Sequence, residues 1–218
     1  VGSEMCIRDR YHSKGCFYTR TTGIWQTVWL EFVPRMYLKS VQVTTDYRMG
    51  SVTFLATVNE LPKALTLRTS ISFDGKPCAS FETPLSAGGT IYTMQVGDVK
   101  CWDILQPNLY DVTYELLDGN AVIDTVQSYF GFRTVELREH SLWLNGRPIF
   151  QRLVLDQGYY PDGVYTAPTD ADLKRDIELS IALGFNGARL HQKVFEERFL
   201  CWADRLGYLV WGEQASWG

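Results

Sequence analysis

Five polar residues in the second half of the chain have side chains suited to binding or proton transfer. Asp156 and Gln157 follow one apolar run, Arg189 and His191 close a second, and Glu213 follows a third. Carboxylates and imidazoles act as general acids and bases, and a guanidinium binds a carboxylate through paired N–H groups. Gathered in one place, these groups would form a polar binding or catalytic site.

Three short apolar segments alternate with two helical patterns in this part of the chain. The predicted strands are Phe150–Leu155, Phe185–Leu190 and Tyr208–Trp211. Strands joined through helices over short connections form parallel βαβ units. In parallel sheets and barrels alike, active sites lie at the carboxyl ends of the strands. The pattern therefore predicts that the five polar residues share one edge of a parallel sheet.

Both predicted helices have signals at their ends. Thr169 with Asp172 resembles a capping box at the start of the first helix, with Asp in place of the usual Glu. Gly184 follows the last apolar position of that helix, where a left-handed cap favours glycine. The second helix is predicted over Phe199–Leu206 and ends at Gly207.

The composition excludes several classes of protein. The net charge is −4 and no basic stripe is present, which argues against nucleic acid and against an anionic membrane surface as partners. No apolar segment approaches the roughly 20 residues of a membrane-spanning helix. The five cysteines have no paired spacing, so they predict neither a disulfide framework nor a metal site, and we expect them to be small core residues. No cofactor is indicated.

The middle of the chain has the pattern of an antiparallel β domain. Turn signals such as Asp74-Gly75 and Asp118-Gly119 separate strand-sized segments. Seven such segments within roughly 100 residues predict an immunoglobulin-like β-sandwich. The segments are Leu38–Thr45, Ser51–Val58, Ala64–Phe73, Ala79–Pro84, Gly89–Val96, Tyr110–Leu117 and Ala121–Arg133.

Two further segments set the expected domain boundaries. In Gly23–Phe32, both the odd-numbered and the even-numbered positions are largely apolar, which predicts a strand with both faces covered. Pro34 marks a boundary after this segment. Asn145-Gly146 between apolar segments predicts a hairpin that leads into the first parallel strand. Val1–Arg10 fits no period and is interpreted as an artefactual tail. The predicted domains are 11–34, a sandwich over 35–136 and an α/β domain over 137–218.

A set of motifs, in the same order along the chain, resembles landmarks of glycoside hydrolase family 2, the family of β-galactosidases, β-glucuronidases and β-mannosidases. The motifs are Gly23–Glu31, Pro107–Tyr110, Phe130–Arg133, Asn145–Pro148, Phe185–Arg189 with His191, and Trp202–Gly207 before Trp211-Gly212-Glu213. The resemblance implies the last strand of a jelly-roll sugar-binding domain, an immunoglobulin-like sandwich and the first three strands of a TIM (β/α)8 barrel.

The resemblance also implies a chemistry and a partner. The family hydrolyses O-glycosidic bonds of β-linked sugars with retention, using two glutamates whose carboxyl groups lie roughly 5 Å apart. Those glutamates follow the fourth strand and end the seventh, so both are expected beyond Gly218 and this chain alone is expected to be inactive. A carbohydrate substrate is the implied partner, and a homo-oligomer of the full-length protein stays open.

The same resemblance suggests roles for the five polar residues. Arg189 matches the arginine that orients the nucleophile, and His191 stands one residue before the usual position of a sugar-contacting histidine. Glu213 would bind a substrate hydroxyl or support a neighbour. Asp156 and Gln157 replace the His-Glu pair of β-galactosidases and β-glucuronidases, which leaves the sugar specificity open.

Simpler interpretations stand beside these roles. Arg189 can instead form a structural ion pair with Glu213 or Asp156, and His191 can be a satisfied structural histidine. The aromatic residues, 14% of the chain, can form a sandwich core or stack on sugar rings. At the level of the protein, the alternatives are a non-catalytic carbohydrate-binding or scaffold protein on the same domains, and an adhesion module fused to an unrelated α/β domain.

Overall fold

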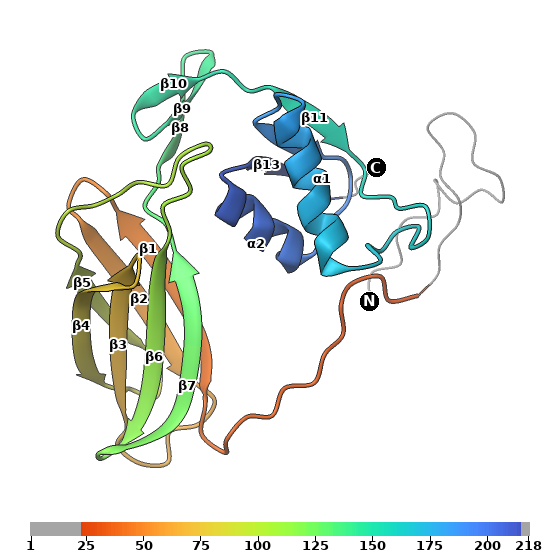
Figure 1. The fold of residues 1–218 in the computed structure, drawn as a ribbon. Helices are drawn as coiled ribbons and strands as arrows, with labels where there is room; N and C mark the ends of the chain where they lie inside the picture. The colour runs from red at the N-terminus through yellow and green to blue at the C-terminus, as the bar shows by residue number, and fades with distance from the viewer. Residues whose placement is uncertain (1–22, 215–218) are drawn as a thin grey trace. The chain divides into compact units, whose positions relative to one another are not determined.

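The computed structural model describes residues 23–214, and the segments Val1–Arg10 and Tyr11–Arg20 lie outside that range. The chain divides into two compact units (Figure 1). One unit spans residues 30–149, and the other combines residues 23–29 with the chain from Phe150 onward. No helix within the described range is long and apolar enough to cross a bilayer.

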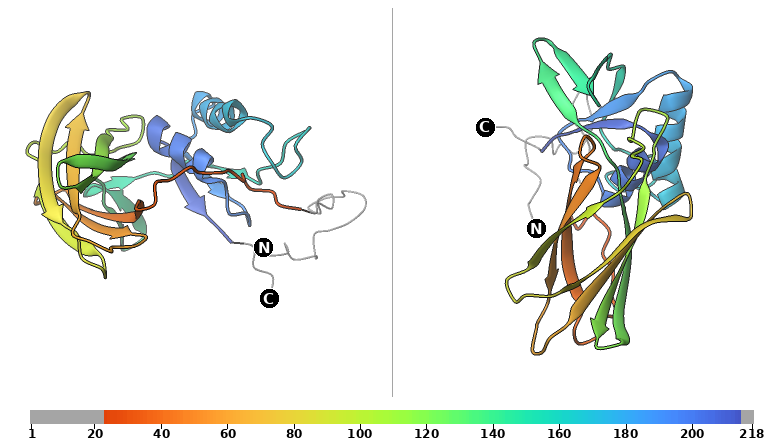
Figure 2. Two further views of the ribbon diagram at one scale, coloured as in Figure 1. Left: turned by 90° about the horizontal axis from the view of Figure 1, so that it is seen from below. Right: turned by 90° about the vertical axis from the view of Figure 1, so that its left-hand side faces the viewer.

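The first unit contains a sandwich of two antiparallel sheets, each of which can be followed in Figures 1 and 2. The three-stranded sheet has the order β1 (Leu38–Asp46), β2 (Ser51–Val58), β5 (Thr90–Gln95). The four-stranded sheet has the order β4 (Lys76–Pro84), β3 (Thr66–Phe73), β6 (Tyr110–Asp118), β7 (Ala121–Phe130). This arrangement fits the predicted immunoglobulin-like domain, and all seven predicted strands are present.

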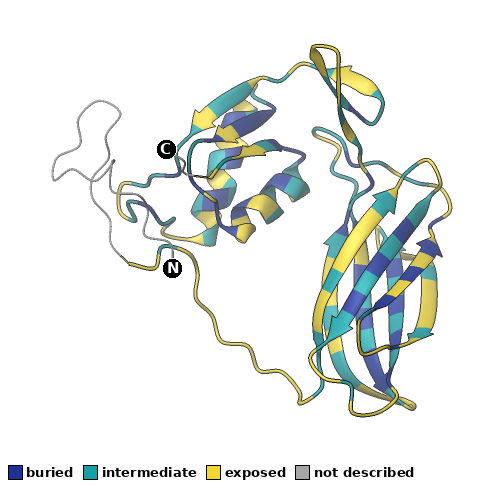
Figure 3. Ribbon diagram, turned by 180° about the vertical axis from the view of Figure 1, so that it is seen from behind, coloured by how far each residue is buried: buried dark blue, intermediate teal, exposed yellow. Residues whose placement is uncertain are grey.

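Alternating burial along the strands shows why this sequence forms a sandwich. Residues of β2, β3, β5 and β6 alternate between buried and less buried positions, which is visible as banding in Figure 3. Phe54 lies at the centre of an aromatic core, with its ring centroid 5.2 Å from Tyr92, 5.9 Å from Tyr114 and 6.1 Å from Phe130. Strands with one apolar face bury that face by packing sheet on sheet.

A small three-stranded antiparallel sheet ends the first unit. It contains β8 (Val135–Arg138), β9 (Ser141–Leu144) and β10 (Arg147–Ile149). The predicted hairpin is confirmed, because Asn145 and Gly146 connect β9 to β10 with positive φ angles of 51° and 75°. Both central residues of such a tight turn need this conformation, which Asn and Gly adopt most easily. Strand β8 was not predicted from the sequence.

The second unit has the predicted parallel α/β pattern. Its elements, in chain order, are β11 (Leu153–Asp156), α1 (Asp170–Ala182), β12 (Gly187–Leu190), α2 (Glu197–Leu206) and β13 (Leu209–Gly212). Parallel pairing joins β11 to β12 and β12 to β13. The helix ends follow their sequence signals, since the Thr169 side chain accepts a hydrogen bond from the Asp172 N–H and Gly207 adopts a left-handed φ of 67°.

The two faces of this sheet differ. Ala188 and Leu190 of β12 are buried in one apolar cluster with Ile177 of α1 and Phe199 of α2. Both helices therefore cover the same face. Arg189 points to the other face, where its register partners Leu155 and Trp211 are 53% and 51% exposed. The described residues thus form a short sheet with one helix-covered face and one open face.

Two sequence-based predictions are wrong in detail. Residues 23–34 contain no strand, and Leu30 and Phe32 are exposed instead of covered. A strand needs a neighbouring strand to which its backbone is hydrogen-bonded, and no described strand pairs with this segment. Cys78 is exposed and is not a core residue, whereas Cys101 is partly buried and packs against the sandwich core, and Cys201 is partly buried. The interpretation of 11–34 as the end of a jelly roll remains a prediction.

Candidate functional site

The five polar residues lie at the carboxyl edge of the parallel sheet, as the sequence predicted. Asp156 is the last residue of β11 and Gln157 follows it; Arg189 lies within β12, His191 follows that strand, and Glu213 follows β13. Parallel strands present their carboxyl ends on the same side, so three separate segments contribute to this edge.

Arg189 and Glu213 form an ion pair between adjacent strands. The Arg189 Nε–H donates to Glu213 Oε1, and the Gln192 backbone N–H donates to Glu213 Oε2 over 3.2 Å. The Arg189 hydrogen bond is the main cause that lowers the pKa of Glu213 below its usual value. Glu213 is therefore an ionised carboxylate at neutral pH. Gln192 has a φ of 54°, a backbone conformation that non-glycine residues rarely adopt outside functional or strained sites.

Gln157 and His191 form a second contact at the same edge. Gln157 Nε2 lies 3.3 Å from His191 Nδ1, and the His191 backbone N–H donates to the Asp156 carbonyl oxygen over 2.7 Å. Each nitrogen of a neutral imidazole donates or accepts according to the tautomer, so this contact places the His191 ring beside Gln157. The side chain and the backbone of His191 are thus both in contact with the end of β11.

Asp156 has the opposite electrostatic character to Glu213. Its Oδ1 accepts a hydrogen bond from the Gly158 N–H over 2.8 Å, but burial raises the pKa of the carboxyl above its usual value. Its register partner Leu190 belongs to the helix-covered face, whereas Arg189 belongs to the open face. The sheet therefore separates Asp156 from the Arg189–Glu213 pair, and of the two ion pairs considered for Arg189 the structure forms the one with Glu213.

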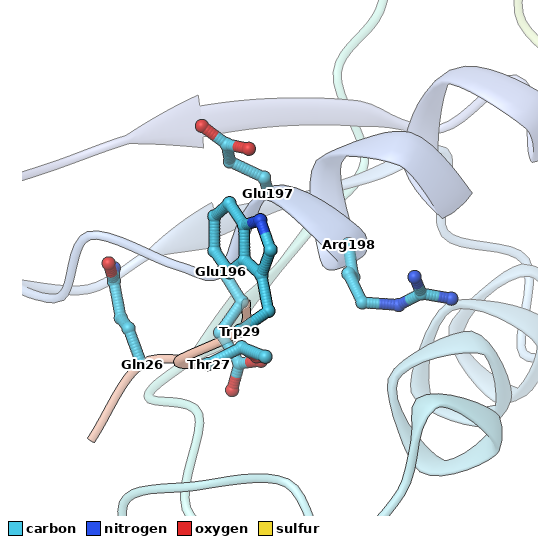
Figure 4. Close-up of a pocket in the computed structure, with 6 residues that line it drawn as sticks. All are labelled: Gln26, Thr27, Trp29, Glu196, Glu197 and Arg198. Atoms are coloured by element: carbon cyan, nitrogen blue, oxygen red, sulfur yellow. The ribbon is translucent and has the colours of Figure 1, made fainter. Parts of the chain in front are cut away.

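A cleft of about 410 Å³ lies between residues 26–29 and the start of α2 (Figure 4). Its lining residues are Gln26, Thr27, Trp29, Glu196, Glu197 and Arg198. It includes none of the five predicted site residues. Within residues 23–214 no cluster of three or more His, Cys, Asp or Glu side chains is arranged to hold a metal ion.

One residue near the edge was missed by sequence reasoning. Lys193 is only 3% exposed, and its ammonium group donates to two backbone carbonyls. Nothing in the sequence distinguishes it from a surface lysine, because its neighbours His191 and Val194 give no burial pattern. Its partners come from loops that are distant in the sequence, and only the folded chain brings them together.

The opposite pKa shifts predict opposite effects of two amide substitutions on stability. The pKa of Glu213 is lowered by folding, so its stabilising effect is present above the unfolded pKa and is lost as the pH falls through the folded pKa. The pKa of Asp156 is raised by folding, so the folded state loses stability as the pH rises from the unfolded pKa through the folded one. At neutral pH we expect Glu213→Gln to destabilise the α/β unit and Asp156→Asn to stabilise it.

Urea unfolding at neutral pH and at about pH 3 checks both signs, because protonation of a carboxyl removes the charge on which its effect depends, so the two differences should shrink as the pH falls. The amide introduced by Asp156→Asn retains an oxygen that can accept from the Gly158 N–H, so this substitution changes mainly the charge. Two shifts of the same sign at neutral pH would contradict the assignment of opposite environments.

Comparison with known proteins agrees with the fold and the motifs. Residues 36–133 match the family model described as glycosyl hydrolases family 2. A protein of Formosa agariphila whose name includes β-glucuronidase is 29% identical over 198 residues, covering 88% of this chain and 24% of the relative. The β-galactosidase of Vibrio vulnificus is 28% identical over 209 residues, covering 88% of this chain and 20% of the relative.

Solved structures show the same fold. A glycosyl hydrolase family 2 member from Bacteroides cellulosilyticus superposes with a TM-score of 0.79 at 22% identity, over 92% of this chain and 28% of that protein. A β-glucuronidase from Ruminococcus gnavus superposes with a TM-score of 0.70 at 20% identity, over 84% of this chain and 30% of that protein.

The class defined by these findings is a multidomain β and α/β protein with an immunoglobulin-like domain. Within it, residues 36–133 are the part that matches glycosyl hydrolases family 2. It spans 24% and 20% of the length of the first two curated relatives.

Proposed function

We propose that this chain is part of a retaining glycoside hydrolase that cleaves O-glycosidic bonds of β-linked sugars. The α/β unit is then the opening arc of a (β/α)8 barrel, and residues 23–34 are the end of a jelly-roll sugar-binding domain. The observation that carries the proposal is the Arg189–Glu213 pair on the open face of the sheet, at its carboxyl edge. In barrel enzymes, this edge carries the active site.

The geometry suits a sugar pocket. Glu213 occupies Nε of Arg189, and a guanidinium has four further N–H groups that can donate to a carboxylate or a hydroxyl. Arg189 would thus orient the nucleophilic glutamate while Glu213 fixes the arginine. His191 and Gln157 would meet sugar hydroxyls. The relatives named as β-galactosidases and β-glucuronidases support β-linked sugars, while Asp156 and Gln157 leave the particular sugar undecided.

In this proposal, the acid/base and nucleophile glutamates belong to a longer protein of which the chain is part. The relatives are several times longer than the matched region, which supports this. The 218-residue chain would then bind and orient the substrate but would not hydrolyse it.

The test uses the longer reading frame that contains this chain. Hydrolysis of nitrophenyl β-galactoside and β-glucuronide is measured before and after the glutamate that follows the fourth barrel strand is changed to glutamine. We expect kcat to fall by at least about 100-fold, because general acid–base catalysis contributes on that order or more. Glu178→Gln on the exposed side of α1 is the matched control, and it should leave hydrolysis unchanged.

Unchanged hydrolysis in the acid/base variant would refute the proposed mechanism. A complete barrel that lacks either glutamate, with retained binding of a β-glycoside, would favour the non-catalytic carbohydrate-binding protein instead.

A further inference from the structure

The buried lysine next to the site joins parts of the chain that are distant in sequence. Lys193 follows β12 and is 3% exposed. Its Nζ donates to the carbonyl oxygen of Gly158 over 2.7 Å and to that of Tyr165 over 2.8 Å. Lysine is rarely buried unless its charge is engaged, so these two bonds mark a specific role for this side chain.

Three aromatic rings surround the same ammonium group. Nζ lies 4.4 Å from the ring centroid of Tyr165, 5.0 Å from that of Phe195 and 5.5 Å from that of Trp25. A cation near the face of an aromatic ring is attracted to it, and the attraction is larger where water is excluded. The rings come from the β11–α1 loop, the β12–α2 loop and residues 23–29, so Lys193 contacts three separate segments.

Further hydrogen bonds hold residues 25–27 at this place. The Trp25 carbonyl accepts from Thr166 Oγ1 over 2.9 Å, and Gln26 Nε2 donates to the Val194 carbonyl over 3.1 Å. Thr27 Oγ1 lies 3.2 Å from Glu196 Oε2; Figure 4 shows Thr27 and Glu196 beside each other at the cleft. The backbone of Trp25 and the residues after it are thereby fixed next to Lys193.

The loop that Lys193 binds has a strained backbone. Tyr160 and Val164 exchange backbone hydrogen bonds of 2.8 and 2.9 Å and close a tight turn, and Val164 has a φ of 54°. A β-branched residue in the left-handed region is unfavourable and persists only where the surroundings hold it. Gly158 and Tyr165, the two acceptors of Lys193, lie on either side of this turn. Lys193 therefore holds both ends of the strained segment 158–165.

This segment begins directly after the residue that contacts His191. Gln157 precedes Gly158, and the Gly158 N–H is bonded to Asp156 while the Gly158 carbonyl is bonded to Lys193. The N–H and the carbonyl of Gly158, the residue after Gln157, are thus both held by hydrogen bonds. Displacement of Gly158 would move Gln157 and break its 3.3 Å contact with His191 Nδ1.

We infer that Lys193 is a positioning residue: by clamping segment 158–165 it holds Gln157 against the imidazole of His191 at the carboxyl edge. The relevance of this role to sugar binding rests on the proposed function. The sugar would meet Gln157 and His191, and Lys193 would act only through them.

The experiment compares Lys193→Met with Lys174→Met in the full 218-residue chain. Methionine has a similar length but neither charge nor donors. Lys174 is the matched control because its Nζ also lies over an aromatic ring, 5.2 Å from the centroid of Trp202, but its side chain is 39% exposed. Hydrogen exchange is read for residues 158–166, α1 and α2, and ¹⁵N chemical shifts are read for the imidazole of His191. The exposed His140 in the sandwich unit serves as an internal reference.

For Lys193→Met we expect exchange over 158–166 to accelerate by about tenfold or more, which corresponds to loss of about one buried hydrogen bond. The ¹⁵N shift of His191 Nδ1 should change because that nitrogen loses its contact with Gln157, while Lys174→Met leaves both readouts as in the wild type. If α1 and α2 also exchange rapidly in Lys193→Met, the α/β unit has unfolded. In that case Lys193→Gln, which retains one donor group, replaces it and is judged by the same two readouts.

Exchange over 158–166 that does not differ between the Lys193 and Lys174 variants would overturn the clamp. Faster exchange with unchanged His191 shifts would overturn the positioning role, since Lys193 would then hold the loop only. Neither readout requires hydrolysis. If the longer protein has no glycosidase activity, the proposed function fails, but the exchange rates and the His191 shifts still decide the role of Lys193.

Discussion

Replacing Gly187 by alanine should destabilise the α/β unit by roughly 3 kcal/mol or more, at the upper end of overpacking effects. Gly187 is the first residue of β12, between its partners Leu153 and Leu209. An added Cβ would lie 2.7 Å from Leu153 Cδ2 and 2.8 Å from Leu209 Cβ, and it would also overlap the Leu209 carbonyl oxygen. The central strand has a neighbour on each side, so the overlap cannot be relieved by a side-chain rotation alone.

Gly212→Ala is the control for this prediction. Gly212 is the last residue of the adjacent strand β13, and a Cβ added there meets no atom within 4 Å. Hydrogen exchange of α1 and α2 reports on the unfolding of this unit separately from the sandwich. Equal exchange in the two alanine variants would show that β12 and β13 are farther apart at this position than the structure has them.

The second large effect is expected in the sandwich core, where Phe54→Ala should cost about 3–5 kcal/mol of unfolding free energy. Phe54 has 0% exposure and contacts the rings of Tyr92, Tyr114 and Phe130. Removal of its ring takes away edge and stacking contacts with all three and leaves a cavity between the two sheets. Urea unfolding measures the loss of unfolding free energy, and hydrogen exchange of the backbone amides in β2 and β6 shows that the loss is in the sandwich.

Phe81→Ala provides the matched comparison on the same domain. The Phe81 ring also stacks on Tyr92, at 6.0 Å, but Phe81 is 44% exposed. Its removal leaves no enclosed cavity, so we expect a loss of about 1 kcal/mol or less. A loss at Phe81 as large as that at Phe54 would mean that β4, and not the centre of the sandwich, limits the stability of the domain.

The secondary structure was predictable because its signals are local. Alternating apolar residues located β2, and Asn145-Gly146 located the hairpin. Thr169 marked the start of α1 through a side-chain hydrogen bond, and Gly207 marked the end of α2 through its left-handed backbone. Both effects depend on only a few neighbouring residues. The edge of the sheet where Arg189 and Glu213 meet was predictable for a related reason, since parallel strands end on the same side.

Other features depend on partners that are distant in sequence, and no local pattern predicts them. Residues 23–32 have the composition of a strand, but pairing requires a neighbour that alternation along one segment cannot supply. Asp156 and Arg189 are separated because Asp156 lies on the face of the sheet that the helices cover and Arg189 lies on the other face. Burial of Lys193 depends on Tyr165, which lies 28 residues earlier, and on Trp25, which lies farther still along the chain.

The short parallel sheet has a consequence for handling the protein. Within residues 23–214, β11 and β13 each pair with β12 alone, which leaves one row of peptide N–H and C=O groups on the outer side of each strand. Such rows can accept a further strand from any chain of compatible sequence. Copies of the 218-residue chain by itself would therefore be expected to join edge to edge as their concentration rises, and the oligomers so formed would grow through main-chain bonding instead of through a specific side-chain interface.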